Sequence, residues 1–197
     1  MIWDNGTTRI ENCAVFFRVR EEFGKLSNMC NWFPLRVHGI EVQSTEALYQ
    51  ACRFPHQPDW QSEILAAKHA MQAKLMAYNQ NRRAASRPDW DDVRVPIMRW
   101  CLQLKLYQHF GELCQVLRST GNRTIVERSS KDRFWGAVLE ADRVLRGENV
   151  LGMLLTDLRD NVIDWMSGED DDEEWPEPIT PDIDNLMLLG HDLRYVV

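Results

Sequence analysis

Apolar side chains recur at helical spacing between residues 91 and 110, and this pattern constrains the fold more than any other in the chain. The positions are Val93, Ile97, Trp100, Leu104 and Tyr107. Residues three and four apart lie on one face of a helix, so the segment predicts a central helix with one buried side. Pro96 is close enough to the start for the helix to tolerate it or to begin there.

Shorter segments around this helix predict a mixture of helices and a few strands. Strands are expected at residues 14–19 and 124–127, and a hairpin at residues 35–42 that turns at His38 and Gly39. Further helices are expected to begin near Glu46 and to cover residues 59–70, 71–78, 112–118 and 150–165. A chain of 197 residues, 44% of them hydrophobic, can bury one sizeable core. We therefore predict an α+β fold, a mainly helical single domain with a small β-sheet.

Charge is distributed unevenly along the chain. The formal net charge is −7, but residues 165–197 hold ten acids and one base, which leaves twenty acids and twenty-two bases in residues 1–164. The body can therefore hold a phosphate, although it is no basic nucleic-acid stripe. Residues 1–165 are predicted to form the domain and residues 166–184 an acidic, proline-containing linker. Residues 185–197 are predicted to be a C-terminal segment that docks on the domain.

Cysteine and histidine spacing indicates neither a metal site nor a disulfide framework. The cysteines, at positions 13, 30, 52, 101 and 114, are odd in number and form no C-x-x-C pair. The histidines, at positions 38, 56, 69, 109 and 191, have no metal-ligand spacing. We expect no metal, no cofactor and a reducing, cytoplasmic location. No signal peptide or membrane span is indicated, so we expect a soluble protein without a membrane partner.

The first candidate for chemistry is a carboxylate at the start of a predicted helix. Ser44 is a good N-cap, and Glu46, Gln50 and Arg53 follow on one face at positions i, i+4 and i+7. In the alternative interpretation Glu46 only complements the helix dipole and Arg53 pairs across the surface, for about 0.3 to 1 kcal/mol in all.

The second candidate is Lys105, which follows apolar neighbours on the central helix. In one interpretation Lys105 extends its charge to water past an apolar stem, as lysine often does. If Lys105 instead reaches a pocket, desolvation lowers its pKa, and the amine could anchor an anion or attack a sugar aldehyde.

A third cluster combines a carboxylate with aromatic side chains. Asp132 precedes Phe134, Trp135 and Gly136 in a polar loop, where an aspartate is usually a turn residue. Trp135 either packs in the core or stacks on a flat base, and Trp90 allows the same two interpretations. Asn149 at the head of a helix is either only its N-cap or marks N–H groups that suit a phosphate.

Two separated carboxylates suit the breaking of an N-glycosidic bond. That reaction passes through an oxocarbenium-like sugar and calls for a carboxylate near the anomeric carbon, an activated water and a donor to the departing base. Glu46 and Asp132 could fill these roles. Their separation would distinguish a nucleophile from a general base, and the sequence does not give it.

Taken in order, several short motifs resemble the NADAR family, also called YbiA-like. They are Phe23 with Leu26-Ser27-Asn28, Thr45-Glu46-Ala47-Leu48-Tyr49-Gln50-Ala51, Arg87-Pro88-Asp89-Trp90-Asp91, Lys105, Thr120-Gly121, Val126-Glu127, Lys131-Asp132-Arg133-Phe134-Trp135-Gly136 and Gly147-Glu148-Asn149-Val150-Leu151-Gly152. The resemblance spans roughly residues 14–162 and implies an α+β, largely helical domain that hydrolyses N-glycosidic bonds without a metal. Two departures are Met29, where members often have an aromatic residue, and Arg53, where many have a lysine. Arg53 would bind phosphate as a rigid fork, which could alter substrate choice.

The resemblance also implies that Glu46, Trp90, Lys105, Asp132 and Trp135 belong to the active site, with Asn28, Gln50, Arg53 and Asn149 around the sugar and phosphates. Within this set we infer finer roles. We assign Glu46, Lys105 and Asp132 as catalytic, and as substrate-binding Asn28, Gln50, Arg53, Trp90, Trp135, Gly136 and Asn149.

The family is associated with two substrates. They are riboflavin-pathway intermediates that carry a phosphoribosylamino group, and ADP-ribose attached to guanine in nucleic acid. The slightly basic body favours ADP-ribosyl-guanine, which would make an ADP-ribosyltransferase the partner of a reversal system. A module that binds ADP-ribose or a nucleotide without chemistry is the alternative from another class. In a further hypothesis, the acidic tail is an inhibitory arm over the pocket.

Overall fold

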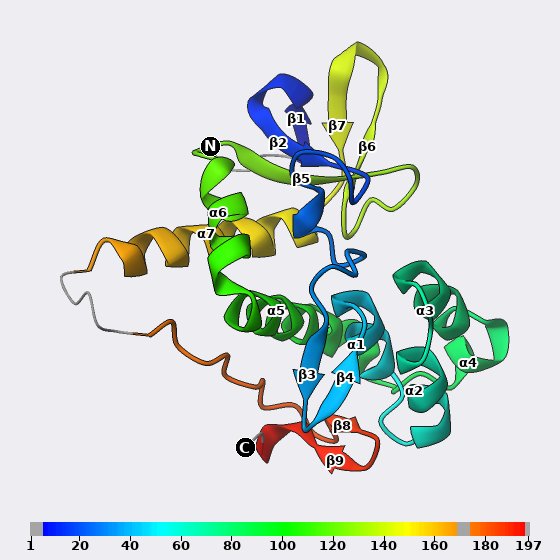
Figure 1. The fold of residues 1–197 in the computed structure, drawn as a ribbon. Helices are drawn as coiled ribbons and strands as arrows, with labels where there is room; N and C mark the ends of the chain where they lie inside the picture. Colours follow the sequence, from blue (N-terminus) through cyan, green and yellow to red (C-terminus); the bar gives the residue numbers. More distant parts are fainter. Residues whose placement is uncertain (1–5, 169–173, 196–197) are drawn as a thin grey trace. The chain divides into compact units, whose positions relative to one another are not determined.

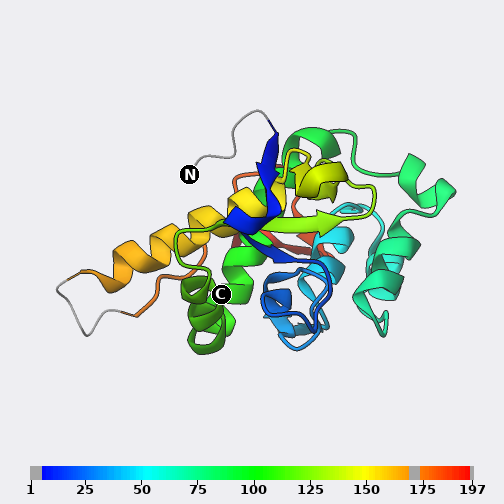
Figure 2. The ribbon, with the colours of Figure 1, turned by 90° about the horizontal axis from the view of Figure 1, so that it is seen from above.

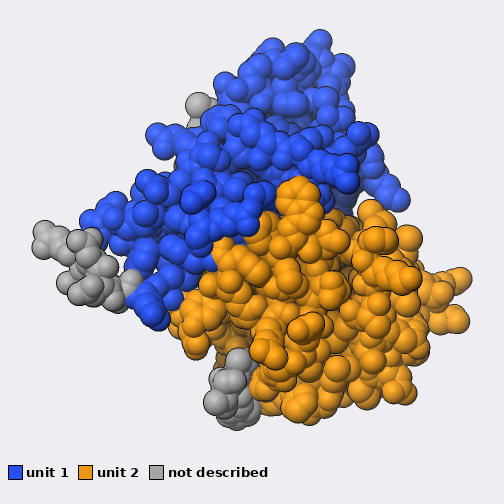
Figure 3. Space-filling model, in the orientation of Figure 1, with its two compact units in different colours: residues 1–27, 110–175 blue, residues 28–109, 176–197 orange. Residues whose placement is uncertain are grey.

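Two compact units divide the chain in the computed structural model, which describes residues 6–168 and 174–195 (Figure 3). Unit 1 comprises residues 1–27 and 110–175, and unit 2 comprises residues 28–109 and 176–197. The predicted class is confirmed: the described residues form an α+β fold in which helices predominate and the largest sheet is small (Figure 1).

Unit 1 is built on a five-stranded mixed sheet with the order β1-β7-β6-β5-β2. Its elements are β1 (Thr7–Arg9), β2 (Cys13–Phe16), α6 (Phe110–Ser119), β5 (Thr124–Ser129), β6 (Ala137–Leu139), β7 (Val144–Arg146) and α7 (Val150–Met166), with short 3-10 helices at Ile10–Asn12, Gly24–Leu26 and Ala141–Arg143. β5 lies parallel to both β2 and β6, whereas β7 is antiparallel to β1 and β6. Helix α7 packs along β5, and α6 packs on α7 (Figure 2).

Unit 2 is helical, with two hairpins. Its elements are β3 (Leu35–Val37), β4 (Ile40–Val42), α1 (Thr45–Ala51), α2 (Pro58–Leu65), α3 (Ala70–Ala77), α4 (Gln80–Ala84), α5 (Trp90–Gln108), β8 (Met187–Leu188), β9 (His191–Asp192) and a 3-10 helix at Leu193–Tyr195. Helix α1 is buried along its whole length and packs against α2, α3 and α5. The hairpin predicted at His38 and Gly39 is confirmed, since both residues have a positive φ, 49° and 75°, as a tight two-residue turn requires.

Several predicted boundaries were wrong. The first strand ends at Phe16 rather than at residue 19, and the helix expected at residues 59–70 ends at Leu65. The central helix runs from Trp90 to Gln108 and contains Pro96, and α6 begins at Phe110. Strands β1, β6 and β7 and helix α4 were not predicted, because elements of three to five residues carry too few positions for a periodic pattern.

The segment predicted to be a linker has specific contacts on both sides of the acidic run. Residues 169–173, which are all of that run except Glu174, lie outside the described residues. In unit 1 the Trp175 ring stacks on Phe110 with centroids 5.3 Å apart and meets Trp165 edge-on at 5.5 Å. In unit 2 the Tyr107 hydroxyl donates a hydrogen bond to Glu177 at 2.9 Å.

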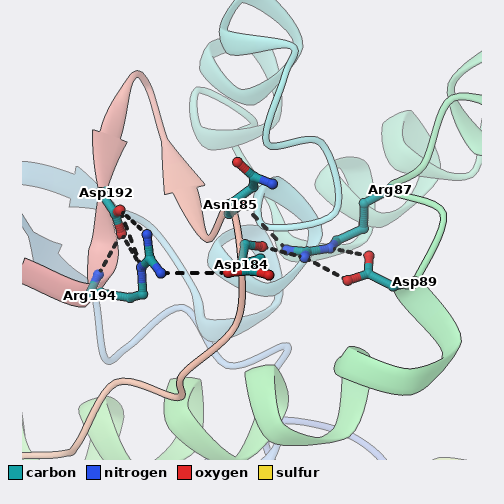
Figure 4. Close-up of polar contacts among 6 residues, drawn as sticks. All are labelled: Arg87, Asp89, Asp184, Asn185, Asp192 and Arg194. Atoms are coloured by element: carbon teal, nitrogen blue, oxygen red, sulfur yellow. Dashed lines mark hydrogen bonds and ion pairs between the residues drawn. The ribbon is translucent and has the colours of Figure 1, made fainter.

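Arg87 binds the C-terminal segment in unit 2 (Figure 4). Its Nη2 donates to the Asp184 carbonyl oxygen at 2.7 Å, and its Nη1 to that of Asn185 at 3.4 Å. The same guanidinium forms an ion pair with Asp89 and donates hydrogen bonds to its carboxylate. This bonding lowers the pKa of the Asp89 carboxyl. Arg194 in turn pairs with Asp192 at 2.7 Å. Leu186, Leu188 and Leu193 are fully buried beyond this cluster, so the hairpin β8–β9 contributes to the core of unit 2.

Gln61 joins α1, α2 and the C-terminal hairpin through one side chain with no exposure to solvent. Its Nε2 donates to the carbonyl oxygens of Ala51 at 3.0 Å and Met187 at 2.8 Å. Its Oε1 accepts from the Leu189 N–H at 2.7 Å. Three backbone groups therefore depend on one amide.

We predict that Gln61→Leu lowers the free energy of unfolding by about 3 kcal/mol, because a side chain of similar size leaves these buried backbone groups unpaired. Urea denaturation followed by circular dichroism measures the change. Gln115→Leu, at an exposed position of α6, is the matched control and should stay within about 0.5 kcal/mol of the wild type. An equally small effect of Gln61→Leu would contradict the bonding described.

Candidate active site

The Glu46 carboxylate is buried and held at both oxygens. It lies in the first turn of α1, where the Ser44 hydroxyl caps the helix by accepting from the Ala47 N–H at 3.2 Å. Only 2% of Glu46 is exposed. The interpretation in which Glu46 merely complements the helix dipole at the surface is therefore wrong.

Two side-chain amides orient this carboxylate. Gln50 Nε2 donates to Glu46 Oε1 at 2.8 Å, and Asn28 Nδ2 donates to Oε2. The backbone adds a third link, since the Glu46 N–H donates to the Asn28 carbonyl oxygen at 3.0 Å. The amide donors are neutral, so they fix the direction of the carboxylate without cancelling its charge.

Two polar atoms beside Glu46 are buried without a hydrogen-bond partner among the described residues. They are Gln50 Oε1 and Thr45 Oγ1, both on α1. A buried acceptor without a donor costs about 1–3 kcal/mol, and such atoms in native proteins call for an explanation. A bound molecule with hydroxyl or N–H groups would supply the missing partner of Gln50.

Lys105 lies inside unit 2 and does not extend to solvent. It is 2% exposed on α5, and its Nζ lies 5.2 Å from the centroid of the Phe33 ring. Burial lowers the pKa of this ammonium from 10.5 to about 8, and the nearby Cys30 thiol opposes the shift. The interpretation in which the lysine extends its charge to water is wrong. Burial instead makes the amine easier to deprotonate than that of an ordinary lysine.

Arg53 and Trp90 form a stacked arrangement in the same unit. The Arg53 guanidinium lies 5.2 Å from the Trp90 ring and 5.0 Å from the Tyr78 ring, and its Nε donates to Ser86 Oγ at 2.7 Å. Trp90 also packs against Tyr49, with ring centroids 5.0 Å apart. Arg53 is 6% exposed, so the interpretation in which it pairs across the surface is wrong. Its guanidinium instead lies over the Trp90 and Tyr78 rings.

Asp132 lies in unit 1, in the loop that joins β5 to β6. Its Oδ1 accepts from the backbone N–H groups of Phe134 at 3.0 Å and Trp135 at 2.9 Å, and its own N–H donates to Ser129 Oγ at 2.9 Å. The carboxylate therefore closes the turn that presents Phe134 and Trp135, whose rings meet edge-on at 5.0 Å. Oδ2 takes part in none of these turn bonds.

Asn149 and Gly136 have structural tasks in unit 1. Asn149 is fully buried, its Nδ2 donates to the Ile125 carbonyl oxygen at 2.9 Å, and its Oδ1 accepts from the Glu127 N–H at 3.1 Å. It occupies the N-cap position of α7, but its side chain bonds to β5 and does not cap the helix. A Cβ on Gly136 would lie 2.4 Å from the Glu127 carbonyl oxygen, so only glycine fits there.

The N–H groups expected to be free at the head of α7 are occupied, which corrects the phosphate site considered for this helix. Those of Asn149, Val150 and Leu151 donate to the carbonyl oxygens of Gly136, Phe134 and Trp135 at 3.3, 3.0 and 3.0 Å. Backbone of the Asp132 loop thus takes the place of an anion.

The predicted site residues fall into one set in each unit. Unit 2 holds Asn28, Glu46, Gln50, Arg53, Trp90 and Lys105; unit 1 holds Asp132, Trp135, Gly136 and Asn149. Within the described residues 6–168 and 174–195, no three His, Cys, Asp or Glu side chains are grouped to hold a metal ion. In the same part of the chain, no helix combines the length and the apolar character that crossing a bilayer requires.

Comparison with known proteins decides the family. Residues 15–163 match the family model of the NADAR domain, which includes parts of both units. The chain belongs to the NADAR family. The predicted resemblance is thereby confirmed over nearly the same residues.

Relatives of this NADAR chain are named for glycosidase activity or riboflavin biosynthesis. It is 31% identical over 147 residues to N-glycosidase YbiA of Shigella boydii, covering 75% of this chain and 86% of that protein. It is 31% identical over 157 residues to an N-glycosidase of Nostoc punctiforme, covering 77% and 94% of the two chains. A riboflavin biosynthesis protein of Vibrio vulnificus is 30% identical over 164 residues, covering 82% of this chain and 42% of its own length.

A solved structure shows the same fold. The NMR structure of Escherichia coli YbiA superposes on this NADAR chain with a TM-score of 0.68 at 24% identity, covering 86% of this chain and 96% of that one. At this identity the likeness concerns the fold alone.

The i+4 spacing of Glu46 and Gln50 predicts their contact, because such positions lie together on a helix. The bond from Asn28 to the carboxylate could not be predicted, because no local pattern links residues eighteen positions apart. The contacts of Arg53 with Tyr78 and Ser86 were not predicted either.

We predict that the buried amine of Lys105 makes stability depend on pH. Its pKa is lower in the folded chain, so between about pH 8 and 10.5 the unfolded chain binds more protons and the free energy of unfolding rises with pH. Between pH 7.5 and 9.5 the wild type should gain about 2 kcal/mol relative to Lys105→Met.

Urea denaturation of both proteins at the two pH values measures this difference. Lys68→Met, at an exposed lysine of the same unit, is the control and should follow the wild type. Parallel behaviour of wild type and Lys105→Met would show that the amine is not desolvated.

Proposed function

We propose that this NADAR protein is an N-glycosidase whose substrate is ADP-ribosyl-guanine in nucleic acid. The observation that carries the proposal is the buried Glu46 carboxylate, oriented by two amides beside the unpartnered acceptor Gln50 Oε1. The enzyme class, a hydrolase of N-glycosyl bonds, agrees with the names of the relatives.

The proposed chemistry uses the charge of Glu46. As the bond between the sugar C1′ and the base nitrogen breaks, positive charge develops on the sugar, and a fixed carboxylate stabilises that charge without reorganising. Water supplies its oxygen to C1′ and a proton to the departing base. Gln50 Oε1 would accept a hydrogen bond from a sugar hydroxyl, which supplies the donor it lacks.

Arg53 fits the phosphates of such a substrate. Its planar guanidinium is stacked on Trp90 and Tyr78 and anchored at Nε by Ser86, so its orientation is set before a ligand arrives. The role predicted for Asp132, guiding the water, stays a prediction. Replacing it by Asn tests that role separately from Glu46.

A second substrate is favoured by a specific observation. Relatives of this chain in Vibrio vulnificus and Arabidopsis thaliana are named riboflavin biosynthesis proteins. A phosphoribosylamino intermediate of that pathway would present the same sugar-to-nitrogen bond and one phosphate. Against it, the slightly basic body and the stacked Arg53 favour a substrate with more phosphate charge.

Turnover measurements distinguish the two proposed substrates from each other and from a non-catalytic binding module. The protein is incubated with ADP-ribosylated guanosine or with the phosphoribosylamino intermediate, in the presence of EDTA, and base release is followed by chromatography. Faster release from ADP-ribosylated guanosine supports the proposal, and faster release from the intermediate favours the riboflavin reading. Binding of ADP-ribose without release from either compound would identify a non-catalytic module. A genomic pairing with an ADP-ribosyltransferase would support a reversal system.

We predict that Glu46→Gln lowers kcat for base release by about 100-fold or more, because the amide keeps the shape of the side chain and removes the charge that stabilises the sugar cation. Glu41→Gln, at an exposed carboxylate of β4, is the control and should retain full activity. The thermal midpoints of both variants show whether they fold. If folded Glu46→Gln releases base as fast as the wild type, the catalytic assignment is wrong.

We predict that Lys105 acts as an amine nucleophile. With a pKa of about 8, roughly a tenth of the amine is neutral at pH 7, far more than for an ordinary lysine. Once water has cleaved the N-glycosidic bond and the base has left, the neutral amine would add to the C1′ aldehyde of the ring-opened sugar and lose water to form an imine. Sodium borohydride, which supplies hydride, would reduce that imine to a stable secondary amine.

Mass spectrometry after borohydride treatment should therefore find the sugar attached at Lys105. The rate of adduct formation should rise with pH towards a plateau above about 8, because the neutral amine is the reactive form. Lys105→Arg keeps the cation and should form no adduct. Base release that slows as pH rises through 8, with Lys105→Arg active and no adduct on the wild type, would instead show that Lys105 anchors an anion.

A further inference from the structure

A long acid-free segment crosses unit 2 in a chain whose net charge is negative. Between Glu63 and Asp89 the sequence contains no Asp or Glu, while lysine or arginine occupies positions 68, 74, 82, 83 and 87. This segment includes α3 and α4. Arg82 forms an ion pair with Glu63 and Arg87 with Asp89, the acids that bound the segment, so the local excess of positive charge comes from Lys68, Lys74 and Arg83.

Tyr78, at the C-terminal end of α3, presents an exposed aromatic ring among three cations. It is 43% exposed, and its centroid lies 5.0 Å from the Arg53 guanidinium, 5.8 Å from that of Arg83 and 5.9 Å from Lys74 Nζ. A ring that stacks on a base, surrounded by cations that meet phosphates, is the combination that binds single-stranded nucleic acid.

A groove lined in part by Asn79, the residue after Tyr78, offers groups that can bind base edges. It has a volume of about 470 Å³ and lies between α2, α3 and α4. The lining includes the amides of Gln72, Asn79 and Asn81, the apolar Leu75, and Trp60 with the Arg82 guanidinium 5.3 Å from its ring. Arg82 Nη1 is buried and has no hydrogen-bond partner among the described residues.

The chemistry of this surface favours nucleic acid over a protein partner. Exposed apolar side chains on α3, such as Met71 at 55% and Leu75 at 65%, would also suit a protein partner. An acidic protein surface would account for the cations, but it does not call for an exposed aromatic ring among them together with side-chain amides in the nearby groove. A strand of nucleic acid accounts for the charge, the exposed ring and the amides together.

We infer that the surface formed by α3, α4 and Tyr78 binds a single strand of nucleic acid next to the modified nucleotide. This inference rests on the proposed function, because it extends the ADP-ribosyl-guanine substrate along its strand. Arg53 connects the two, since the residue assigned to the substrate phosphates also contacts Tyr78. Arg83 and Lys74 would meet backbone phosphates, and Tyr78 would stack on an unpaired base.

Binding of an unmodified oligonucleotide tests the surface independently of catalysis. Fluorescence anisotropy of the full chain with a labelled 12-nucleotide DNA strand should give saturable binding in the micromolar range at 50 mM salt. Because stacking needs unpaired bases, the duplex of the same sequence should bind at least several-fold more weakly. Absence of saturable binding, or equal binding of the duplex, would overturn the inference.

Variants locate the binding surface. Tyr78→Ala should weaken binding roughly ten-fold, whereas Tyr78→Phe, which keeps the ring, should not. Arg83→Glu should weaken binding and reduce the slope of log Kd against log salt by about one. Arg118→Glu makes the same charge change at an exposed position of α6 and is the control.

Equal weakening by Arg83→Glu and Arg118→Glu would reduce the effect to net charge and overturn the assignment. A stable dimer in solution that Leu75→Glu dissociates would also overturn it, since the face would then be covered by a second copy. Strand binding without base release would support this inference and count against the proposed function. Base release without strand binding would support the proposed function and overturn this inference.

Discussion

Unit 2 depends on the burial of polar side chains along helix α1. Every residue of α1 is buried, although Thr45, Glu46 and Gln50 are polar. A helix buried on all sides is ordinarily apolar on all sides, because an unpaired buried polar group costs free energy. The amides of Asn28 and Gln50 offset this cost for the carboxylate, but Thr45 Oγ1 and Gln50 Oε1 remain without partners in the described residues. Groups of this kind lower stability and are retained where function requires them.

Burial inside unit 2 also lowers the pKa of Lys105. Unit 2 places an amine of lowered pKa and an oriented carboxylate on two helices that pack against each other, α5 and α1. The negative charge of Glu46 also reaches Tyr49 and Cys101, where it adds to the effect of burial and raises the pKa of the phenol and of the thiol. A carboxylate whose orientation is fixed by amide hydrogen bonds is suited to stabilise a cationic transition state.

Features that depend on residues close together in the sequence could be predicted from sequence patterns. The turn at His38 and Gly39 was predictable because a two-residue hairpin requires a positive φ, and the spacing of Glu46 and Gln50 because a helix repeats every 3.6 residues. The Asp132 loop was predicted as a turn, but strand β6 after it was not. A parallel neighbour of β5 ordinarily needs a long crossover, whereas here only residues 130–136 join the two strands. That connection is held by the Asp132 carboxylate and by α7 N–H groups, both of which depend on the folded chain.

Long-range polar contacts explain the other differences between sequence and structure. Asn149 has the composition of a helix cap, yet its amide pairs with β5 because Gly152 permits a close approach: a Cβ there would lie 2.2 Å from the Ile125 carbonyl oxygen. Gln61 looks like an ordinary surface residue of α2 until the C-terminal hairpin covers it.

Net charge is likewise a poor guide to which ligand a single face can bind. A net charge of −7 argues against a polyanionic partner only if charge is evenly distributed, whereas this chain concentrates acids in its tail and omits them from residues 64–88. For a ligand that contacts one face, the charge of that face decides attraction, because screening removes the influence of charges beyond about 10 Å.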